Sequence, residues 1–437
     1  MLKRKVYDRL LSWKNSPSKR ALLVTGARQI GKTYIIRKFA EEQYESVVEL
    51  NFILDPDAKS IFERTDSAKD IMLRLSLVAP AQLLPGRTCI FLDEIQEAPE
   101  VLTAIKGLVD QGDYDFILSG SLLGVELNNI RSNPVGYAST VKMFPLDFEE
   151  FCWANGVEPN VFEYLAQCLA SQTQIDCSVN ERMLDLFRKY LVVGGMPDAV
   201  QTYVASNNLA MVRDVQESVR DWYRTDITKY CPKENRLKAK DAYDLVPSEL
   251  DNPNKRFVLK NLNERARLRS YEDAFLWISA ANVTLPVFNV EEPASPLLAS
   301  KQRNLFKLFY SDVGLLTSSY SRKTALSLLD GTSEINHGSA YENAVAQELA
   351  AHGFDLYYFN SKKFGGIDFV IEDRDGEVLP IEVKSGKSYR SHSAISNVLE
   401  VENFHLAKGY VFGADNIQCV GKILYAPIYC VSLLVNE

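Results

Sequence analysis

The stretch GARQIGKT, residues 26–33, constrains the fold of this chain more than any other feature of its sequence. It matches the pattern G-x-x-x-x-G-K-[ST], in which glycines let the backbone curl so that successive N–H groups face an anion. A strand-like run, ALLVT, precedes it, and a helical pattern, KTYIIRKFAEEQ, follows it. Because such a loop joins a strand to a helix, the stretch predicts an α/β domain that binds phosphate.

Strand-like and helix-like segments continue to alternate beyond this loop. The further apolar runs are SVVELNF, RTCIFLDEIQ and YDFILSGS, at residues 46–52, 87–96 and 114–121. Nearly continuous apolar strands that alternate with helices are typical of a parallel sheet covered on both faces. We therefore expect residues 1–155 to form one P-loop α/β domain.

The loop itself supplies most of the predicted ATP site. Lys32 would contact the β- and γ-phosphates as a catalytic residue, and the hydroxyl of Thr33 would bind Mg²⁺. The positive end of the following helix dipole would add to the attraction for phosphate. The residues expected to bind the nucleotide here are Gly26, Ala27, Arg28, Gln29, Ile30, Gly31, Lys32 and Thr33.

Polar residues at two further strand ends would complete the site. Asp93 would hold Mg²⁺ through water, and the adjacent Glu94 would polarise the attacking water. Glu94 could instead begin a solvated helix. Ser119 and Ser121 end the next strand-like run, where Ser119 would sense the γ-phosphate unless both belong to a plain turn.

The rest of the chain divides into three predicted regions. Residues 156–235 are helical by periodicity, with an interruption at VVGGMPDAV. Residues 236–330 contain two helix-like and two strand-like segments, which fit a winged-helix-like region. Residues 331–437 begin with a helix and continue with several strands, which predicts a further α/β domain.

A second group of chemically informative residues lies in IDFVIEDRDGEVLPIEVKSG, residues 367–386. Asp368 precedes Glu382 and Lys384, and residues two apart on a strand share a face. The pattern resembles the catalytic core of PD-(D/E)xK restriction-endonuclease-like nucleases. The resemblance implies that Asp368 and Glu382 bind Mg²⁺, while Lys384 orients water or stabilises charge at a phosphate. Glu382 and Lys384 would then be catalytic residues.

The turn between these two strands decides whether the carboxylates can meet. A two-residue turn at Asp375 and Gly376 would place Asp368 opposite Val383, so that it faces away from Glu382. A three-residue loop at 374–376, with Gly376 left-handed, would instead pair Asp368 with Glu382. We predict the second register, because only it places both carboxylates on one face.

Glu342 has two interpretations from the sequence. It shares a helical face with Val345 and Leu349, which is unexpected for a charge. The nuclease family carries a comparable acid on its first helix, so the resemblance implies that Glu342 is a third metal ligand. The same stretch also reads as a capping box, in which Glu342 would bond back to the backbone of Ser339.

The net negative charge of the chain suggests that any contact with nucleic acid is confined to a small part of its surface. The net charge is -8, whereas a protein that coats duplex DNA is usually basic overall. Residues 254–269 hold a local basic excess, which is either a contact for the phosphate backbone or a solvated helix face. Its basic residues are Lys255, Arg256, Lys260, Arg265, Arg267 and Arg269.

The cysteine pattern and hydropathy indicate the compartment. The cysteine count is odd, with 7 in the chain, and no CxxC pair occurs, which suits a reducing cytosol. No secretory signal and no apolar run of about 18 residues is found, so we expect a cytoplasmic protein without a membrane partner.

Taken together, the motifs resemble those of AAA-type ATPases, and most closely a prokaryotic family that joins an AAA module to a C-terminal domain of unknown function. Many relatives carry a Gly-Arg pair, a candidate arginine finger, before the FPLDFEEF-like stretch. Here Tyr137 follows Gly136, which leaves Arg131 as a nearby substitute candidate. The resemblance rests on GARQIGKT, FLDEIQ, LSGS, FPLDFEEF, YLVVGGMPDAV, YRTDITKY and LFKLFYSDVGLL.

The expected architecture is therefore α/β, with an AAA-type domain (1–155), a helical region (156–235), a winged-helix-like region (236–330) and a nuclease-like domain (331–437). The leading hypothesis is an ATP-hydrolysing, Mg²⁺-dependent protein that processes DNA. A rival is a nucleotide-dependent switch that binds DNA or a protein partner without cutting it. A third hypothesis is a motor that remodels DNA or protein, which would require assembly of a homo-oligomeric ring.

Overall fold

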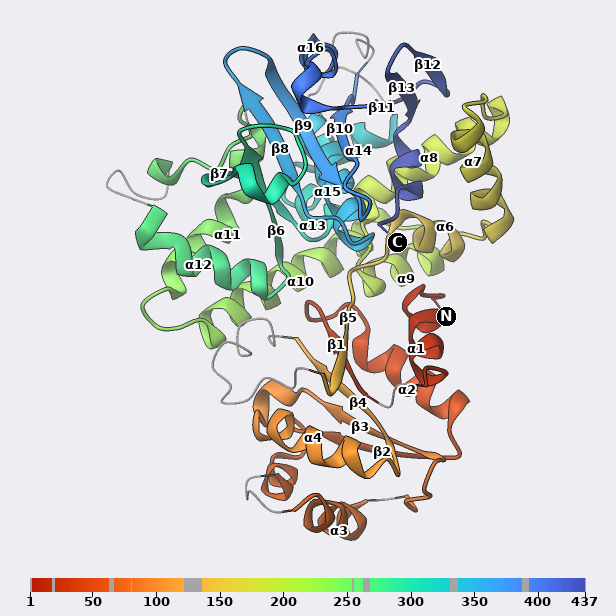
Figure 1. Ribbon diagram of the computed structural model, residues 1–437, viewed down its shortest axis with the longest axis vertical. Coiled ribbons are helices and arrows are strands. Elements are labelled where there is room, and N and C mark those ends of the chain that lie inside the picture. Colours follow the sequence, from red (N-terminus) through yellow and green to blue (C-terminus); the bar gives the residue numbers. More distant parts are fainter. Residues whose placement is uncertain are drawn as a thin grey trace. The chain divides into compact units, whose positions relative to one another are not determined.

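The structure is a computed structural model, in which helices, strands and connecting loops can be followed along most of the chain (Figure 1). It describes residues 2–17, 20–62, 67–79, 81–121, 136–253, 255–261, 268–330, 337–386 and 393–436. In these ranges no helix is both long enough and apolar enough to cross a bilayer.

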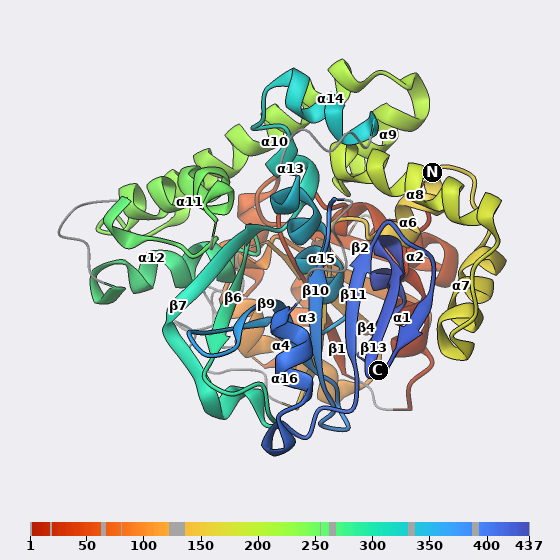
Figure 2. The same ribbon diagram turned by 90° about the horizontal axis from the view of Figure 1, so that it is seen from above.

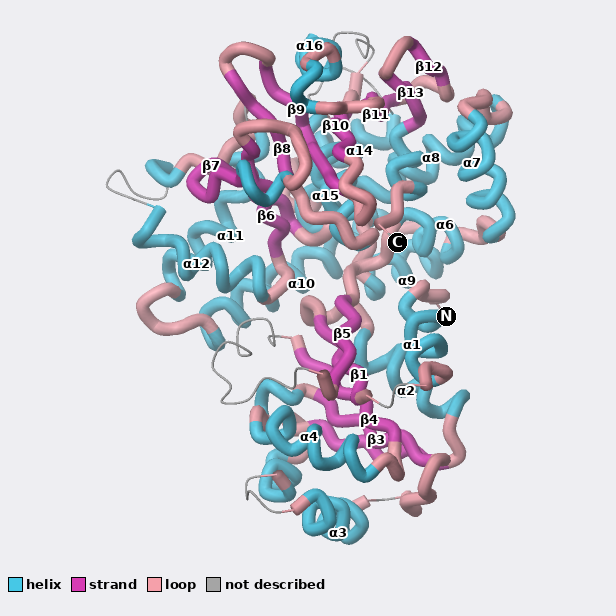
Figure 3. Tube along the Cα trace, in the orientation of Figure 1, coloured by secondary structure: helices cyan, strands magenta, loops and turns pink. Residues whose placement is uncertain are grey.

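The described chain forms an N-terminal unit, residues 4–144 with 280–282, and a C-terminal unit, residues 1–3, 145–279 and 283–437. The described part of the N-terminal unit contains a five-stranded parallel sheet in the order β2-β3-β4-β1-β5, drawn in magenta in Figure 3. Its strands are β1 (Ala21–Thr25), β2 (Ser46–Asn51), β3 (Thr88–Asp93), β4 (Asp115–Gly120) and β5 (Ala138–Lys142).

Helices bury the apolar strands of this parallel sheet. Strand β3 is buried along its whole length, as expected for a central parallel strand. Helix α4 packs its apolar face, with Leu102 and Ile105, into the same core as Ile90 and Leu92 of β3. The helices of this unit are α1 (Val6–Lys14), α2 (Lys32–Gln43), α3 (Ala68–Val78) and α4 (Glu100–Gln111). Short 3₁₀ turns, η1 (Pro56–Ile61) and η2 (Ile95–Glu97), follow β2 and β3.

The C-terminal unit opens with helices, which confirms the helical character expected after residue 156. These are α6 (Phe148–Ala154), α7 (Pro159–Ser171), α8 (Cys177–Val193), α9 (Pro197–Ser206), α10 (Leu209–Tyr230), α11 (Arg236–Asp251) and α12 (Leu268–Ala280). Further helices are α13 (Val313–Thr317), α14 (Arg322–Asp330), α15 (Gly338–Ala351) and α16 (Ser393–Leu399).

Within its described residues, this unit also contains an eight-stranded mixed sheet in the order β12-β13-β11-β10-β9-β8-β6-β7, and Figure 2 shows its strands side by side. Helix α15 packs against β6, β7 and β10, and α16 packs against β9 and β10. The strands are β6 (Thr284–Val290), β7 (Lys301–Tyr310), β8 (Tyr357–Ser361), β9 (Gly365–Glu372), β10 (Val378–Val383), β11 (Gly409–Gly413), β12 (Gln418–Val420) and β13 (Ile423–Pro427). The 3₁₀ turns are η4 (Leu259–Asn261), η5 (Leu297–Ser300), η6 (Glu402–Phe404) and η7 (Ile428–Leu433).

The β9–β10 hairpin has the predicted register. Glu372 pairs with Val378 and Phe369 pairs with Ile381, so the next pair along the ladder is Asp368 with Glu382. The N–H of Asp373 donates to the carbonyl of Glu377 (3.1 Å), and Gly376 in the loop has a φ of 82°. The longer loop therefore brings the two carboxylates opposite one another.

The mixed sheet differs from the expected division of the chain. Strands β6 and β7 were expected in a winged-helix-like region, but β6 pairs in parallel with β8 of the predicted nuclease-like domain. Residues 236–330 are thus not a separate module, because their strands complete a sheet whose other strands come later in the chain. The predicted first domain, residues 1–155, also extends past α6, which belongs to the C-terminal unit.

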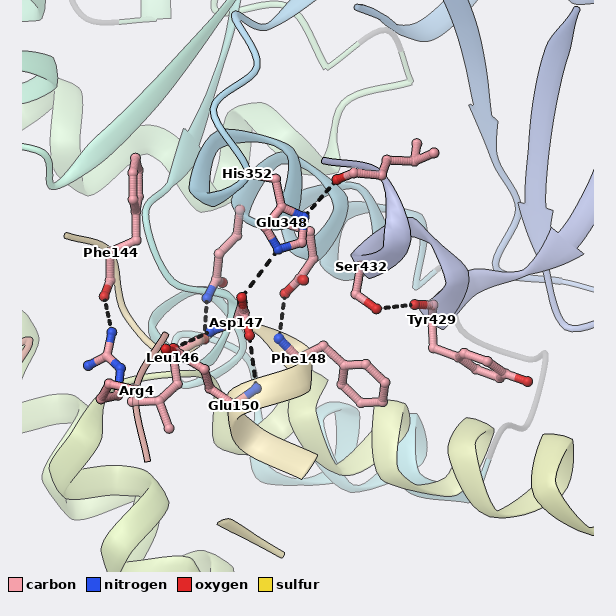
Figure 4. Close-up of polar contacts among 12 residues, drawn as sticks. Arg4, Phe144, Leu146, Asp147, Phe148, Glu150, Glu348, His352, Tyr429 and Ser432 are labelled. Atoms are coloured by element: carbon pink, nitrogen blue, oxygen red, sulfur yellow. Dashed lines mark hydrogen bonds and ion pairs between the residues drawn. The ribbon is translucent and has the colours of Figure 1, made fainter. Parts of the chain in front are cut away.

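Backbone polar groups at Leu146 and Phe148 are held by other residues of the C-terminal unit, and Figure 4 shows the contact between Phe148 and Glu348. The N–H of Leu146 donates to Gly195 (2.7 Å), and its carbonyl accepts from the hydroxyl of Tyr190 (2.9 Å). The N–H of Phe148 donates to the carboxylate of Glu348 on α15 (2.8 Å). The first residues of the C-terminal unit after β5 are therefore fixed to helices distant in sequence.

Candidate functional site

The P-loop follows β1 and leads directly into α2. Gly31 precedes Lys32, the first residue of α2, and has a left-handed φ of 88°. The ammonium of Lys32 donates to the carbonyls of Gly26 (3.1 Å) and Ala27 (2.7 Å), and its side chain is buried. The loop is at the carboxyl end of a central strand, the edge where open α/β sheets bind ligands.

Gly26 is required by a close approach of two backbone segments. A Cβ at this position would lie 2.3 Å from the carbonyl oxygen of Met143, and the φ of Gly26 is 144°. Arg4 supports the same loop from α1's N-terminal side, donating to the carbonyls of Ile30 (3.0 Å) and Phe144 (2.7 Å; Figure 4). The backbone of the P-loop is therefore braced by the segment that follows β5.

Asp93, at the end of β3, connects the P-loop to the neighbouring strand ends. Its Oδ2 accepts from the hydroxyl of Thr33 (3.0 Å) and from the amide of Asn51 at the end of β2 (2.9 Å). Its Oδ1 accepts from the hydroxyl of Ser119 on β4. The structure thus brings together three residues that the sequence predicted for this site, and it adds Asn51.

These oxygen ligands fit a bound Mg²⁺. Mg²⁺ prefers oxygen donors and in phosphate-transfer sites is held by one or two protein groups together with phosphates and water. The hydroxyl of Thr33 and the carboxylate of Asp93 are already in contact, so one ion could reach both. Asp93 is almost fully buried and therefore well fixed in place.

Glu94 does not begin a long solvated helix. It precedes η2, a turn of three residues, whereas α4 starts only at Glu100. The backbone of Glu94 has a left-handed φ of 57°, which is uncommon for a residue with a side chain and occurs often at functional sites. Its carboxylate accepts from the amide of Gln96. This geometry holds an acid next to Asp93.

Burial is the main electrostatic influence on Lys32. It lowers the pKa of Lys32 to about 8, although the nearby carboxylates of Glu94 and Asp93 oppose the change. Arg28, which donates to the hydroxyl of Ser121 (3.3 Å), lowers the pKa of Lys32 slightly further. The P-loop lysine therefore titrates closer to neutral pH than an ordinary lysine.

The structure describes Tyr137, which stands where many relatives carry the arginine, but not Arg131, the substitute candidate for the finger. Tyr137 has its carbonyl bonded to the N–H of Ala21 (2.9 Å), and the ammonium of Lys106 lies 5.0 Å from its ring centre. It therefore serves the packing of the sheet. Arg131 lies outside the described residues.

The second candidate site is an acid–lysine cluster in the C-terminal unit, and Glu342 on α15 is its centre. Both Lys255 and Lys307 form ion pairs with Glu342, and Lys307 is 3.3 Å from Oε2. The capping-box interpretation of Glu342 is wrong, because His337 precedes the helix and Ser339 donates instead to the carbonyl of Leu250 (2.7 Å). The cluster consists of Glu342, Asp368, Glu382, Lys255, Lys307 and Lys384.

A β-bulge in β9 positions Asp368 in this cluster. Tyr357 pairs with Val370 and Phe359 pairs with Ile367, so two residues, Asp368 and Phe369, lie opposite one residue of β8. The Oδ2 of Asp368 accepts from the N–H of Val383 (2.9 Å), and its Oδ1 is 3.9 Å from the ammonium of Lys307. The bulge therefore directs Asp368 toward both β10 and β7.

The carboxylates of the cluster have different electrostatic environments. Burial raises the pKa of Glu382 to about 8, and the nearby Asp368 adds to the increase while Lys384, at 3.2 Å, opposes it. Burial also raises the pKa of Asp368, assisted by Glu342. Burial alone would raise the pKa of Glu342, but Lys307 and Lys255 outweigh it and hold this pKa below its ordinary value.

The cluster as arranged does not fit a divalent cation. Both carboxylate oxygens of Glu342 contact lysines, and both oxygens of Asp368 face a donor or an ammonium. Throughout the ranges that the structure describes, no three His, Cys, Asp or Glu side chains are grouped so that they could hold a metal ion. The three predicted metal ligands, Glu342, Asp368 and Glu382, lie in one cluster, but each of them has a lysine ammonium within 4 Å.

Two of these lysines were not predicted as site residues. Lys307 lies on β7 inside the apolar run LFKLFY. A single lysine within such an apolar run is the sequence signal that could have identified it, because buried lysines are rare unless they are paired. Lys255 was expected in an exposed basic patch but is largely buried against Glu342. Most of the remaining patch, residues 262–267 and the side chains of 268–269, lies outside what the structure describes.

Three stretches of the chain match known protein families. Residues 18–152 match a family described as an AAA domain. Residues 184–325 and 337–430 match two families that are each described as a domain of unknown function (DUF8612 and DUF4143). The acid–lysine cluster draws Lys255 and Lys307 from the first of these and the acids from the second. No curated protein sequence matches the chain.

Solved structures with some likeness include a Walker-type ATPase of Pyrococcus abyssi, at 13% identity and a TM-score of 0.43, covering 73% of this chain and 95% of that one. The Orc1 protein of Aeropyrum pernix in complex with DNA aligns at 15% identity and a TM-score of 0.29, covering 76% and 92%. RuvB of Thermotoga maritima aligns at 14% identity and a TM-score of 0.29, covering 65% and 89%. Because every TM-score is below 0.5, we draw no functional conclusion from these structures. The family match and the P-loop together indicate an AAA domain in residues 18–152.

Proposed function

We propose that this chain is a Mg²⁺-dependent ATPase whose nucleotide cycle controls the binding of DNA by its C-terminal unit. The observation that carries the first part is the contact between Thr33 and Asp93, which joins the P-loop to the end of β3. Lys32 would bind the phosphates, and Thr33 and Asp93 would hold Mg²⁺, with Asp93 acting through water. When bound, Mg²⁺ neutralises charge on the β- and γ-phosphates.

The protein's own residues account for the remaining requirements of hydrolysis. Glu94 would accept a hydrogen bond from the attacking water and orient it toward the γ-phosphate. Ser119, fixed by its bond to Asp93, would respond to the presence of the γ-phosphate through that bond. Asn51 would keep the carboxylate of Asp93 in one orientation.

The ATPase proposal is tested with Lys32→Ala. This variant should keep its fold by circular dichroism and lose ATP binding or turnover. Lys38→Ala is the matched control and should turn over ATP normally. Lys38 lies on the same helix, but its side chain is 28% exposed and its ammonium is 3.8 Å from the carboxylate of Glu42. Normal hydrolysis by Lys32→Ala would show that the phosphate site is assigned wrongly.

The support for DNA as the partner comes from the C-terminal hairpin. Its register and residue types resemble a nuclease core, and the exposed Lys362 and Lys363 of the β8–β9 turn lie at the end of β9 that carries Asp368. Basic side chains near a hairpin edge suit contacts with a phosphate backbone. Binding without cutting is favoured over cleavage by one observation, the pairing of Glu342 with both Lys255 and Lys307.

Cleavage remains the second candidate function, since Asp368, Glu382 and Lys384 lie together. Wild type and Glu382→Ala should be incubated with linear, circular and branched DNA plus Mg²⁺ or Mn²⁺, with and without ATP. We expect both proteins to bind DNA in a nucleotide-dependent way and neither to cut it. Cleavage by wild type that is lost in Glu382→Ala would instead establish a nuclease, and an absence of DNA binding would refute the proposal.

A further inference from the structure

The acid–lysine cluster holds more positive charge than the nuclease-like pattern requires. The sequence pattern contains one lysine, Lys384, whereas the structure adds Lys255 and Lys307. Glu342 and Asp368 contribute two negative charges when ionised, and the two added lysines contribute two positive charges. The added ammonium groups therefore supply the same charge as one Mg²⁺.

We propose that Lys255 and Lys307 take the place of a divalent cation in this cluster. In the present conformation the cluster then does not bind a metal ion. Lys255 must move away from Glu342 before a metal ion can bind. This inference rests on the proposed function, because it concerns the regulation of the unit proposed to bind DNA.

Lys307 is a fixed part of the cluster. It lies within β7 and pairs with Val287 of β6, and its side chain is only 7% exposed. The ammonium is 5.2 Å from the ring centre of Tyr358 and 5.9 Å from that of Phe369, so aromatic faces enclose it as well as carboxylates. Its position between Glu342 and Asp368 is thus set by the sheet itself.

Lys255 is held less firmly. It lies outside helices and strands, in the segment between α11 and η4, and its side chain is 14% exposed. Its backbone has a left-handed φ of 49°, a conformation that costs energy for a residue with a side chain and persists only when its surroundings maintain it. Because its side chain is twice as exposed as that of Lys307 (14% against 7%) and it lies outside the sheet, Lys255 is the removable partner of Glu342.

A cation and these lysines compete for the same oxygens. Lys255 contacts Oε1 of Glu342, and Lys307 lies near Oε2 of Glu342 and Oδ1 of Asp368. Mg²⁺ would need several of these oxygens at short range and would be repelled by each ammonium that stayed. Removal of Lys255 alone frees one carboxylate oxygen and removes one repelling charge.

Mn²⁺ binding by nucleotide-free protein tests the inference without DNA. Titration calorimetry should find no saturable site in wild type that depends on Glu382. Lys255→Met should bind Mn²⁺ at least about tenfold more tightly than wild type, since it loses one repelling charge beside the acids. The gain should disappear in Lys255→Met/Glu382→Gln. Lys260→Met, an exposed lysine in the neighbouring turn η4, is the matched control and should behave as wild type.

Two results would overturn the inference. One is tight Mn²⁺ binding by wild type that is weakened by Glu342→Gln. The other is a folded Lys255→Met protein, checked by thermal melting, whose Mn²⁺ affinity equals that of wild type. If Lys255→Met does not fold, Lys255→Gln keeps a polar partner for Glu342 and carries the same expectation. A failure to bind DNA would refute the proposed function but leave this test unaffected.

Discussion

The lowered pKa of Lys32 predicts how ATP affinity depends on pH. Burial sets this pKa to about 8 in the nucleotide-free site, and bound phosphates would keep the ammonium charged. Above that pH, the binding of ATP must therefore be accompanied by the uptake of a proton by Lys32. The charged fraction of Lys32 falls from about 0.9 at pH 7 to about 0.1 at pH 9, so the Kd for ATP should rise about tenfold, which is ~1.4 kcal/mol.

The assay is the binding of a non-hydrolysable ATP analogue at constant Mg²⁺, followed by calorimetry in buffers of different ionisation enthalpy to detect the proton. The phosphates of the ligand are ionised across this range and do not add a slope of their own. Lys32→Arg is the control. Because arginine stays charged, the affinity of this variant for the ATP analogue should not change between pH 7 and pH 9. Equal affinity of wild type at both pH values, or an equal loss in Lys32→Arg, would refute the reasoning.

Three further substitutions test other parts of the structure. Glu94→Gln should still bind ATP but release phosphate about 10²–10⁴-fold more slowly, and unchanged turnover would remove its role as the base. Gly195→Ala places a Cβ 2.0 Å from the carbonyl oxygen of Leu146, so urea denaturation should show a loss of about 3 kcal/mol. Glu342→Gln leaves Lys255 and Lys307 without their shared counter-charge and should cost about 3–5 kcal/mol by the same measurement. A loss below about 1 kcal/mol in either denaturation experiment would contradict the contact that it tests.

The sequence predicted those parts of the sites that depend on local patterns. The P-loop motif, the strand that ends at Asp93 and the loop at Gly376 each follow from residues close together in the chain. The hairpin register is such a case, because loop length alone decides which residue faces Glu382.

Contacts between distant segments could not be predicted in this way. Lys307 lies 35 residues before Glu342, and their meeting depends on the pairing of β6 with β8, which leaves no local pattern. The same limit explains the winged-helix expectation, since β6 and β7 look like a small independent hairpin until their partner strand is known. The capping box failed for a related reason, because α15 begins already at Gly338 and the hydroxyl of Ser339 donates to the carbonyl of Leu250, far away in the sequence.

The motifs that lack catalytic groups acquire a physical role from the structure. FPLDFEEF, YLVVGGMPDAV and LFKLFYSDVGLL meet where the carboxylate of buried Asp312 accepts from the N–H of Gly195, whose carbonyl in turn accepts from Leu146. The third motif contributes Asp312 to this network and Lys307, five residues earlier, to the acid–lysine cluster. The end of β7 and the residues that follow it therefore hold the first residues after β5 in place, through Asp312, and supply a positive charge to the acid–lysine cluster, through Lys307. A change at either place would have to be accommodated by β7, because a closely packed interior leaves little room for side chains to shift.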